Sequence, residues 1–155
     1  MTKSLYFEDI SVGQRFESGR ATIDAAGIKA FAEKFDPQPF HVDEEAARSS
    51  LFGELVASGW HTAAITMRLN AHGGLPFAGG IIGAGGEIAW PRPTRPGDTL
   101  HVESEILELA ASRSRPDRGT ATVLSRTINQ NGEVVQTLKA RLIVFRKSAA
   151  AARGD

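Results

Sequence analysis

A helix that is apolar on most of its sides is predicted over residues 59–70, and it limits the folds open to this chain. One apolar stripe at helical spacing consists of Trp60, Ala63, Ala64 and Met67. Ile65 and Leu69 fall outside that stripe, so apolar side chains cover more of the circumference than on a typical surface helix. We therefore expect this helix to be buried.

The second half of the chain has the patterns of β-strands. Apolar and polar residues alternate over 100–106 and 138–144, as in strands with one buried face. A third long strand is predicted over 120–128, and Asn131-Gly132 marks a hairpin turn between it and the last strand. The run 73–86 contains seven glycines and is predicted to be a mobile or tightly turned connection.

The first half is mainly helical. A short strand over 15–23 leads into a helix that Asp24 caps and that ends near Phe35. The segment 36–41 is expected to be stiff and non-helical because it holds two prolines, and a short helix follows over 44–49. Helices early and strands late favour an α+β fold, with an antiparallel sheet packed on the apolar helix.

Composition removes several classes of protein. Eighteen basic and eighteen acidic residues leave no formal net charge, which argues against general nucleic-acid binding. The absence of cysteine excludes thiol nucleophiles, disulfides and cysteine-bound zinc. No apolar run is long enough to span a membrane, and the start does not resemble a signal peptide. We expect a cytoplasmic protein with one domain over 1–147 and a small, polar, disordered tail over 148–155.

The segment Asp36-Pro37-Gln38-Pro39-Phe40-His41 carries the strongest chemical signal. It places a carboxylate and an imidazole five residues apart on a backbone that its prolines stiffen. Such a pair can hold one water molecule and carry out acid–base chemistry near neutral pH. The alternative is an ordinary proline-rich turn, in which Asp36 caps a neighbour and His41 caps the next helix.

Gly59 begins the apolar helix, and it is the third candidate residue. Free N–H groups at a helix N-terminus can stabilise an oxyanion or a thioester carbonyl, and a glycine there permits close approach. The alternative is an ordinary helix cap at Ser58 or Gly59.

No metal or cofactor is expected. His61 and His72 would lie roughly 16 Å apart along a helix, too far to share an ion. His41 and the acidic residues 43–45 are neighbours at a helix start and do not converge on one point. The glycine-rich run lacks the nucleotide-binding patterns, and no serine stands in a nucleophile elbow.

In this order and spacing, the motifs resemble the MaoC-like dehydratase family, the (R)-specific enoyl-CoA hydratases of hotdog fold. The family pattern Asp-x-Asn-Pro-hydrophobic-His is matched by residues 36–41. A glycine opens the family's central helix about eighteen residues after the histidine, as Gly59 does here. The segment 91–98 resembles the family's Pro-x-x-Pro-Gly-Asp connection, so the resemblance runs from about Phe7 to Arg146.

The resemblance implies an antiparallel sheet wrapped around a long central helix, and a reversible hydration of trans-2-enoyl thioesters. Asp36 and His41 would bind and activate the water, and the Gly59 N–H would hold the thioester oxygen. The substrate would be carried on CoA or on acyl carrier protein, and the working unit would be a homodimer or an assembly of dimers. Gln38 replaces the family's Asn, so we expect the hydrogen bond that shapes this loop to be replaced or lost.

Two other functions remain open at this point. Other hotdog proteins hydrolyse thioesters, and a protein of this fold can also bind acyl thioesters without turnover. Candidates for contacts to the phosphates of the carrier are Arg68, Arg92 and Arg95.

Overall fold

The computed structural model describes residues 3–148, and five of its strands form one antiparallel sheet in the order β1-β3-β4-β5-β2. The strands are β1 (Arg15–Thr22), β2 (Ile82–Ala89), β3 (Thr99–Ala111), β4 (Arg118–Ile128) and β5 (Val134–Phe145). The helices are α1 (Ala25–Phe35), α2 (Pro39–Val42), α3 (Glu44–Arg48) and α4 (Gly59–Leu69), with a 3-10 turn over Phe7–Asp9 and a π-helical turn over Asn70–Gly74.

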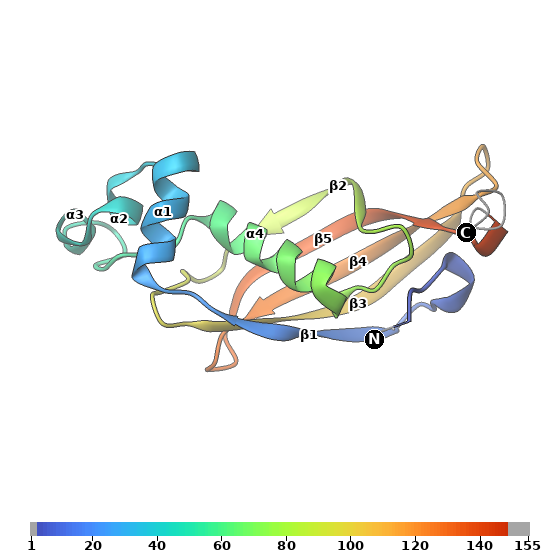
Figure 1. Cartoon of the computed structure of the whole chain (residues 1–155), viewed down its shortest axis with the longest axis horizontal. Coiled ribbons are helices and arrows are strands. Elements are labelled where there is room, and N and C mark those ends of the chain that lie inside the picture. The colour runs from blue at the N-terminus through green and yellow to red at the C-terminus, as the bar shows by residue number, and fades with distance from the viewer. Residues whose placement is uncertain (1–2, 149–155) are drawn as a thin grey trace.

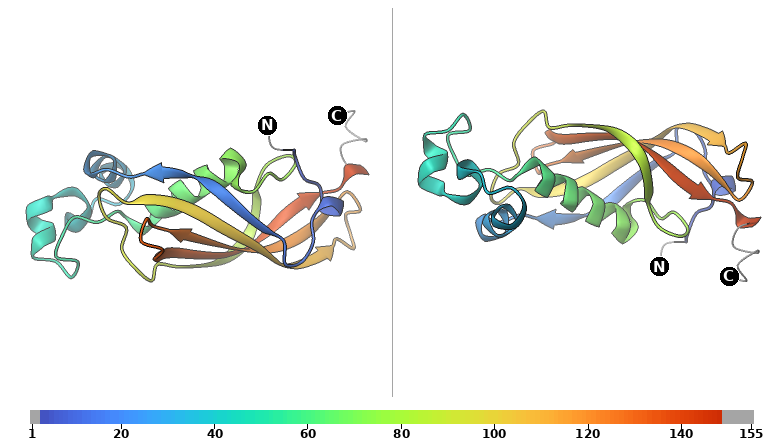
Figure 2. Two further views of the ribbon diagram at one scale, coloured as in Figure 1. Left: turned by 90° about the horizontal axis from the view of Figure 1, so that it is seen from below. Right: turned by 90° about the horizontal axis from the view of Figure 1, so that it is seen from above.

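Helix α4 lies across one face of the sheet, and α1, α2 and α3 gather beyond one end of it (Figures 1 and 2). This confirms the predicted α+β arrangement of an antiparallel sheet packed on the 59–70 helix. Within residues 3–148, no helix is long and apolar enough to cross a membrane. The predicted tail lies, from residue 149 onward, outside the described part of the chain.

Local signals in the sequence produce most of these elements. The Asp24 side chain accepts a hydrogen bond from the Gly27 N–H at 2.7 Å and so begins α1 as predicted. Gly132 has a φ of +76° in the hairpin between β4 and β5, a conformation that glycine adopts without strain. The three late strands and the first strand are all confirmed.

The glycine-rich run was predicted as a connection, and this is wrong for its second part, which forms the edge strand β2. A Cβ atom on Gly86 would lie 2.6 Å from the carbonyl oxygen of Lys139, so only glycine lets β2 approach β5 this closely. Glycines also remove the alternation of apolar and polar side chains, which is the usual signal of a strand.

The prediction that residues 36–41 are non-helical is wrong for its last part, because α2 begins at Pro39. A proline at the first helical position is compatible with a helix, since its missing N–H would have no partner there. His41 lies inside α2 instead of capping the next helix, and the cap of α3 is Asp43.

The apolar stripe of α4 points the opposite way from the expectation. Trp60 is 58% exposed and Met67 is 44% exposed. The α4 residues whose side chains are buried are Thr62, Thr66 and Leu69. Two of these three are polar because the facing strands also present polar groups, and Thr66 exchanges hydrogen bonds with Thr127 and Gln136.

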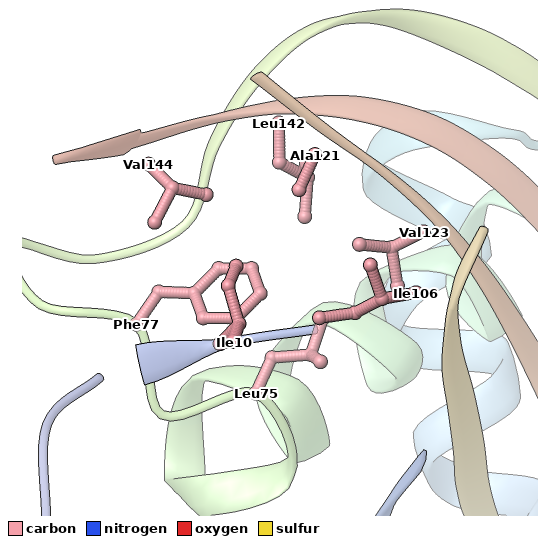
Figure 3. Packing of buried hydrophobic residues seen from close by; sticks show 8 residues of the cluster. All are labelled: Ile10, Leu75, Phe77, Ile106, Ala121, Val123, Leu142 and Val144. Carbon is pink, nitrogen blue, oxygen red and sulfur yellow. The ribbon is translucent and has the colours of Figure 1, made fainter. Parts of the chain in front are cut away.

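Two separate clusters of buried apolar side chains hold the fold together. The larger cluster packs side chains of β3, β4 and β5 against residues from the segments before β1 and after α4 (Figure 3). It consists of Ile10, Leu75, Phe77, Ile106, Ala121, Val123, Leu142 and Val144. The smaller cluster lies under the helical end and consists of Ile23, Ile28, Ala47, Leu55 and Ala57. The smaller cluster includes Leu55 and Ala57 and so fixes the segment 55–57, which borders the site described next.

Candidate active site

A cavity of about 490 Å³ lies where the helical end meets the beginning of α4. Asp36, His41 and Gly59 all line this cavity, so the structure brings together the three residues that the sequence singled out. Trp90 and Arg92, from the segment after β2, line the same cavity. The site therefore combines α2, the start of α4 and the loop that leaves the sheet edge.

His41 is buried, and its ring is held by the backbone. The Nδ1 atom lies 2.7 Å from the carbonyl oxygen of Val56, which can only accept a hydrogen bond. Nδ1 therefore carries the proton, and in a neutral ring Nε2 presents a lone pair. Nε2 faces Asp36 at 3.4 Å from Oδ2. The imidazole is thus aligned to accept a proton next to a carboxylate.

Asp36 is the C-terminal cap residue of α1, and two side chains donate to its carboxylate. The Ser58 hydroxyl donates to Oδ2 at 2.7 Å, and the Gln38 amide donates to Oδ1 at 2.6 Å. Burial alone would raise the pKa of Asp36, but these two hydrogen bonds and the nearby His41 outweigh it and hold the pKa below its usual value. Asp36 is therefore ionised at neutral pH.

The contact with Gln38 shows what the replacement of the family's asparagine does. The longer glutamine side chain turns back and donates to the Asp36 carboxylate. An amide hydrogen bond is therefore present in this loop.

The beginning of α4 has one occupied and one free N–H group next to the carboxylate. Ser58 caps the helix, because its Oγ accepts from the Trp60 N–H at 3.2 Å while its proton goes to Asp36. The N–H of Gly59 has no acceptor among residues 3–148. An unpaired N–H at a helix N-terminus is suited to an oxyanion or a polarised carbonyl.

Gly59 is also required for packing. A Cβ atom at this position would lie 2.6 Å from Cε2 of Trp90, so the indole ring rests directly on the glycine. Any larger residue would push the ring away from the helix start and change the shape of the cavity.

The three candidate arginines have different surroundings. Arg92 lines the cavity, and its Nη1 lies 3.0 Å from a carboxylate oxygen of Glu133. Arg95 pairs with Glu54 at 3.2 Å and does not line the cavity. Arg68 is exposed near the far end of α4, roughly 13 Å along the axis from Gly59, so it is separated from the site.

The described residues contain one group with the spacing of a metal site, on the β1–β3 surface. Its members are Glu17, His101 and Glu103. The Arg20 guanidinium lies 2.9 Å from Nδ1 of His101 and can only donate, so a neutral ring carries its proton on Nε2, facing the carboxylates. Neither ring nitrogen then offers a lone pair to a metal ion, and Arg20 supplies the positive charge.

The histidines at 61 and 72 take no part in the site. His61 stacks on Phe31 with the ring centroids 4.5 Å apart, and burial lowers its pKa. This agrees with the expectation of a packed histidine. His72 lies in the turn after α4.

Sequence reasoning missed the roles of Ser58 and Trp90. Ser58 was considered only as a helix cap, although a hydroxyl can cap a helix and donate to a carboxylate at the same time. No sequence pattern pointed to Trp90. Its contact with Gly59 depends on where the strand order of the sheet places the end of β2.

Comparisons with known proteins identify the family of this chain. The family model described as MaoC like domain matches residues 9–129. The 3-hydroxybutyryl-CoA dehydratase of Methylorubrum extorquens is 33% identical over 113 residues, which are 72% of this chain and 69% of that protein.

Two solved structures show the same fold. The MaoC-like dehydratase of Rhodospirillum rubrum has a TM-score of 0.91 and 64% identity, covering 92% of this chain and 98% of that one. The R-hydratase PhaJ1 of Pseudomonas aeruginosa has a TM-score of 0.75 and 27% identity, covering 92% and 87%. This chain has the hotdog fold and belongs to the MaoC-like family of dehydratases and hydratases.

Proposed function

We propose that this protein catalyses the reversible hydration of 2-enoyl thioesters to 3-hydroxyacyl thioesters. The observation that carries the proposal is the pairing of Asp36 and His41 next to the free N–H of Gly59 in one cavity. The names of the related dehydratase and hydratase support this reaction class.

A water molecule fits the chemistry of the Asp36–His41 pair. The ionised carboxylate and the Nε2 lone pair are both acceptors, and their separation of 3.4 Å is too long for a strong direct hydrogen bond. A water that donates one hydrogen to each would satisfy both groups. Its oxygen would then point its lone pairs into the cavity, toward a bound substrate.

The reaction follows from this placement. The water oxygen adds to C3 of the enoyl group while Nε2 of His41 takes one of its protons. The electrons of the C2–C3 double bond move toward the thioester, and the Gly59 N–H stabilises the negative charge on the thioester oxygen. The imidazolium, stabilised by Asp36, returns the proton to C2. Dehydration is the same sequence in reverse.

We assign the carrier phosphates to the side of the cavity that Arg92 occupies. Its side chain is 60% exposed, and its guanidinium is paired with Glu133. A phosphate or pyrophosphate can compete with an exposed ion pair, because such pairs contribute little stability. Both CoA and acyl carrier protein present a phosphorylated pantetheine arm of this kind.

A homodimer is part of the proposal. Among residues 3–148, no strand pairs with the outer side of β2, and Trp60 and Met67 are exposed on α4 beside it. Exposed strand edges and apolar patches are unfavourable in water, and pairing with a second copy would cover both.

One assay separates the candidate activities. Purified protein is incubated with crotonyl-CoA, and both the conjugated enoyl absorbance and free thiol are followed. We expect absorbance to fall without thiol release. Thiol release would instead indicate thioester hydrolysis, and no change for several chain lengths would overturn both enzymatic functions in favour of a binding protein.

A further inference from the structure

We propose that Trp90, held in place by Gln136, sets the acyl-chain length that this protein accepts. The ring closes the catalytic cavity where it meets a second, apolar cavity, and so restricts the substrate to short acyl groups. This inference rests on the proposed function, because it names the substrate class of the same site.

The second cavity has a volume of about 380 Å³ and lies between α4 and strands β2 and β5. Its walls are largely apolar and include Met67, Ile88 and Leu138. Trp60 lines both this cavity and the catalytic one. The two cavities are therefore neighbours. Trp60 lies at their junction, and Trp90, which lines only the catalytic cavity, contacts Trp60 there.

The junction is closed to an alkyl chain. The ring centroids of Trp60 and Trp90 are 5.2 Å apart with an interplanar angle of 82°, which is an edge-to-face contact. A chain passing between two walls needs roughly 7–8 Å between the wall atoms, twice a carbon–carbon contact distance. Two rings in contact leave no such gap.

Hydrogen bonds to the buried side of α4 hold Trp90 in this position. The indole N–H donates to Oε1 of Gln136 at 3.0 Å, and Gln136 is fully buried. The amide of Gln136 donates to Oγ1 of Thr66 at 3.1 Å. An indole nitrogen can only donate, so the amide orientation is fixed, and the ring is anchored to the helix through two hydrogen bonds.

Thr66 completes this network. Its single hydroxyl proton goes to the carbonyl oxygen of Thr62 at 2.9 Å. Its oxygen then accepts from both Gln136 and Thr127. On the other side, the ring rests on Gly59, where even a Cβ atom would not fit. Trp90 is thus fixed between the helix start and the sheet.

The test measures binding of saturated acyl-CoA thioesters of four to ten carbons by calorimetry, which requires no turnover. In the wild type we expect affinity to stop rising beyond hexanoyl-CoA. Trp90→Leu should open the junction and increase the affinity for octanoyl-CoA relative to butyryl-CoA by at least tenfold, because each methylene that leaves water contributes about fourfold.

Two matched variants serve as controls. Trp90→Phe keeps a ring on Gly59 and should leave the octanoyl-to-butyryl ratio within about threefold of wild type. Ile82→Ala changes the same strand outside both cavities and should leave the ratio unchanged. If Trp90→Leu does not fold, Gln136→Met, which removes the anchor of the indole, should raise the same ratio severalfold.

The outcomes distinguish this inference from the proposed function. The role of Trp90 would be overturned if folded Trp90→Leu left the octanoyl-to-butyryl affinity ratio unchanged. Where Trp90→Leu does not fold, an unchanged ratio in Gln136→Met would overturn it. Neither result would contradict the proposed hydration. A wild type whose affinity keeps rising from hexanoyl-CoA to octanoyl-CoA would also overturn the role of Trp90. The expected ratios without any hydration of crotonyl-CoA would support the chain-length role and overturn the reaction. No binding of any acyl-CoA would overturn both.

Discussion

The two sides of α4 have opposite characters. The side that faces the sheet carries Thr62 and Thr66, whose hydroxyls are paired with groups on the strands and the loop. The side that faces away carries Trp60 and Met67, both exposed. In a typical amphipathic helix the apolar side would be buried.

The two sides of α4 therefore have two different roles: one fixes the helix on the sheet, and the other offers a surface for a second copy of the chain. Buried hydrogen bonds are directional, so the polar side fixes the rotation of α4 and the anchor of Trp90 more strictly than apolar contacts would. At the N-terminus of the helix, the same kind of contact joins Ser58 to Asp36. Apolar contacts are less directional, and the apolar side of α4 is exposed, so it can pack against a second copy of the chain as proposed. Substitutions on each side should therefore affect different properties.

The largest effect is expected at the proposed catalytic pair, Asp36 and His41, where the polar side of α4 meets the site. Asp36→Asn and His41→Gln should each lower kcat for hydration of crotonyl-CoA by at least about a hundredfold, the scale of a lost acid–base group. Asp43→Asn is the matched control, since asparagine caps a helix as well as aspartate does, and its kcat should not change. A near-normal rate in either folded variant would remove that residue from the mechanism.

On the buried side, Thr66→Val should lower the free energy of unfolding by about 2 kcal/mol. The change leaves the Gln136 amide and the Thr127 hydroxyl without their acceptor, and a buried unsatisfied donor costs about 1–3 kcal/mol. Urea denaturation measures the loss. Met67→Leu, on the exposed side, should stay within about 0.5 kcal/mol of wild type, and equal losses in the two variants would contradict the difference between the sides.

On the exposed side, Met67→Glu should weaken self-association at least about tenfold, because it places a charge in the apolar patch. Sedimentation over a range of concentrations measures the association constant. At concentrations where both proteins are dissociated, the melting temperature of the Met67→Glu variant should remain close to that of the wild type. A wild-type chain that sediments as a monomer would contradict the proposed dimer directly.

The smallest effect is expected for Ser58→Ala. The Ser58 hydroxyl stabilises the ionised form of Asp36, so its removal should raise the pKa of that carboxyl. Activity requires the ionised form, and the acid limb of the kcat/KM profile should therefore move to higher pH. The rate at neutral pH should fall only a few-fold. Ser58→Thr keeps the hydroxyl and should leave the limb in place, whereas a shift in both variants would exclude this cause.

Local patterns predicted much of the fold correctly. The alternation in β3 and β5 and the cap at Asp24 are properties of consecutive residues, so they can be identified without knowing the fold. Strand β2 was not predicted because its glycines lack the alternating apolar and polar side chains of a typical strand. Gly86 instead allows the backbone of β5 to approach closely. The partner of such a close approach is distant in the sequence.

Local sequence patterns were sufficient to single out the groups to which we assign the chemistry. Asp36, His41 and Gly59 are named by a stiff proline-rich segment and a helix start, both of which are local features. Their meeting in one cavity agrees with the order of the motifs along the chain.

The orientation of those groups and the walls of the cavity depend on contacts that form only in the folded chain. The His41 tautomer depends on the carbonyl of Val56, and the lowered pKa of Asp36 depends on hydrogen bonds from Ser58 and Gln38. The rotation of α4, with threonines inward and Trp60 outward, depends on polar residues that the sheet presents from β4 and β5. Hydrogen-bond partners distant in the sequence set the tautomer, the pKa and the helix rotation, because a buried polar group must be paired. In α4, this pairing determines which side of the helix faces the sheet, against the prediction from its apolar stripe.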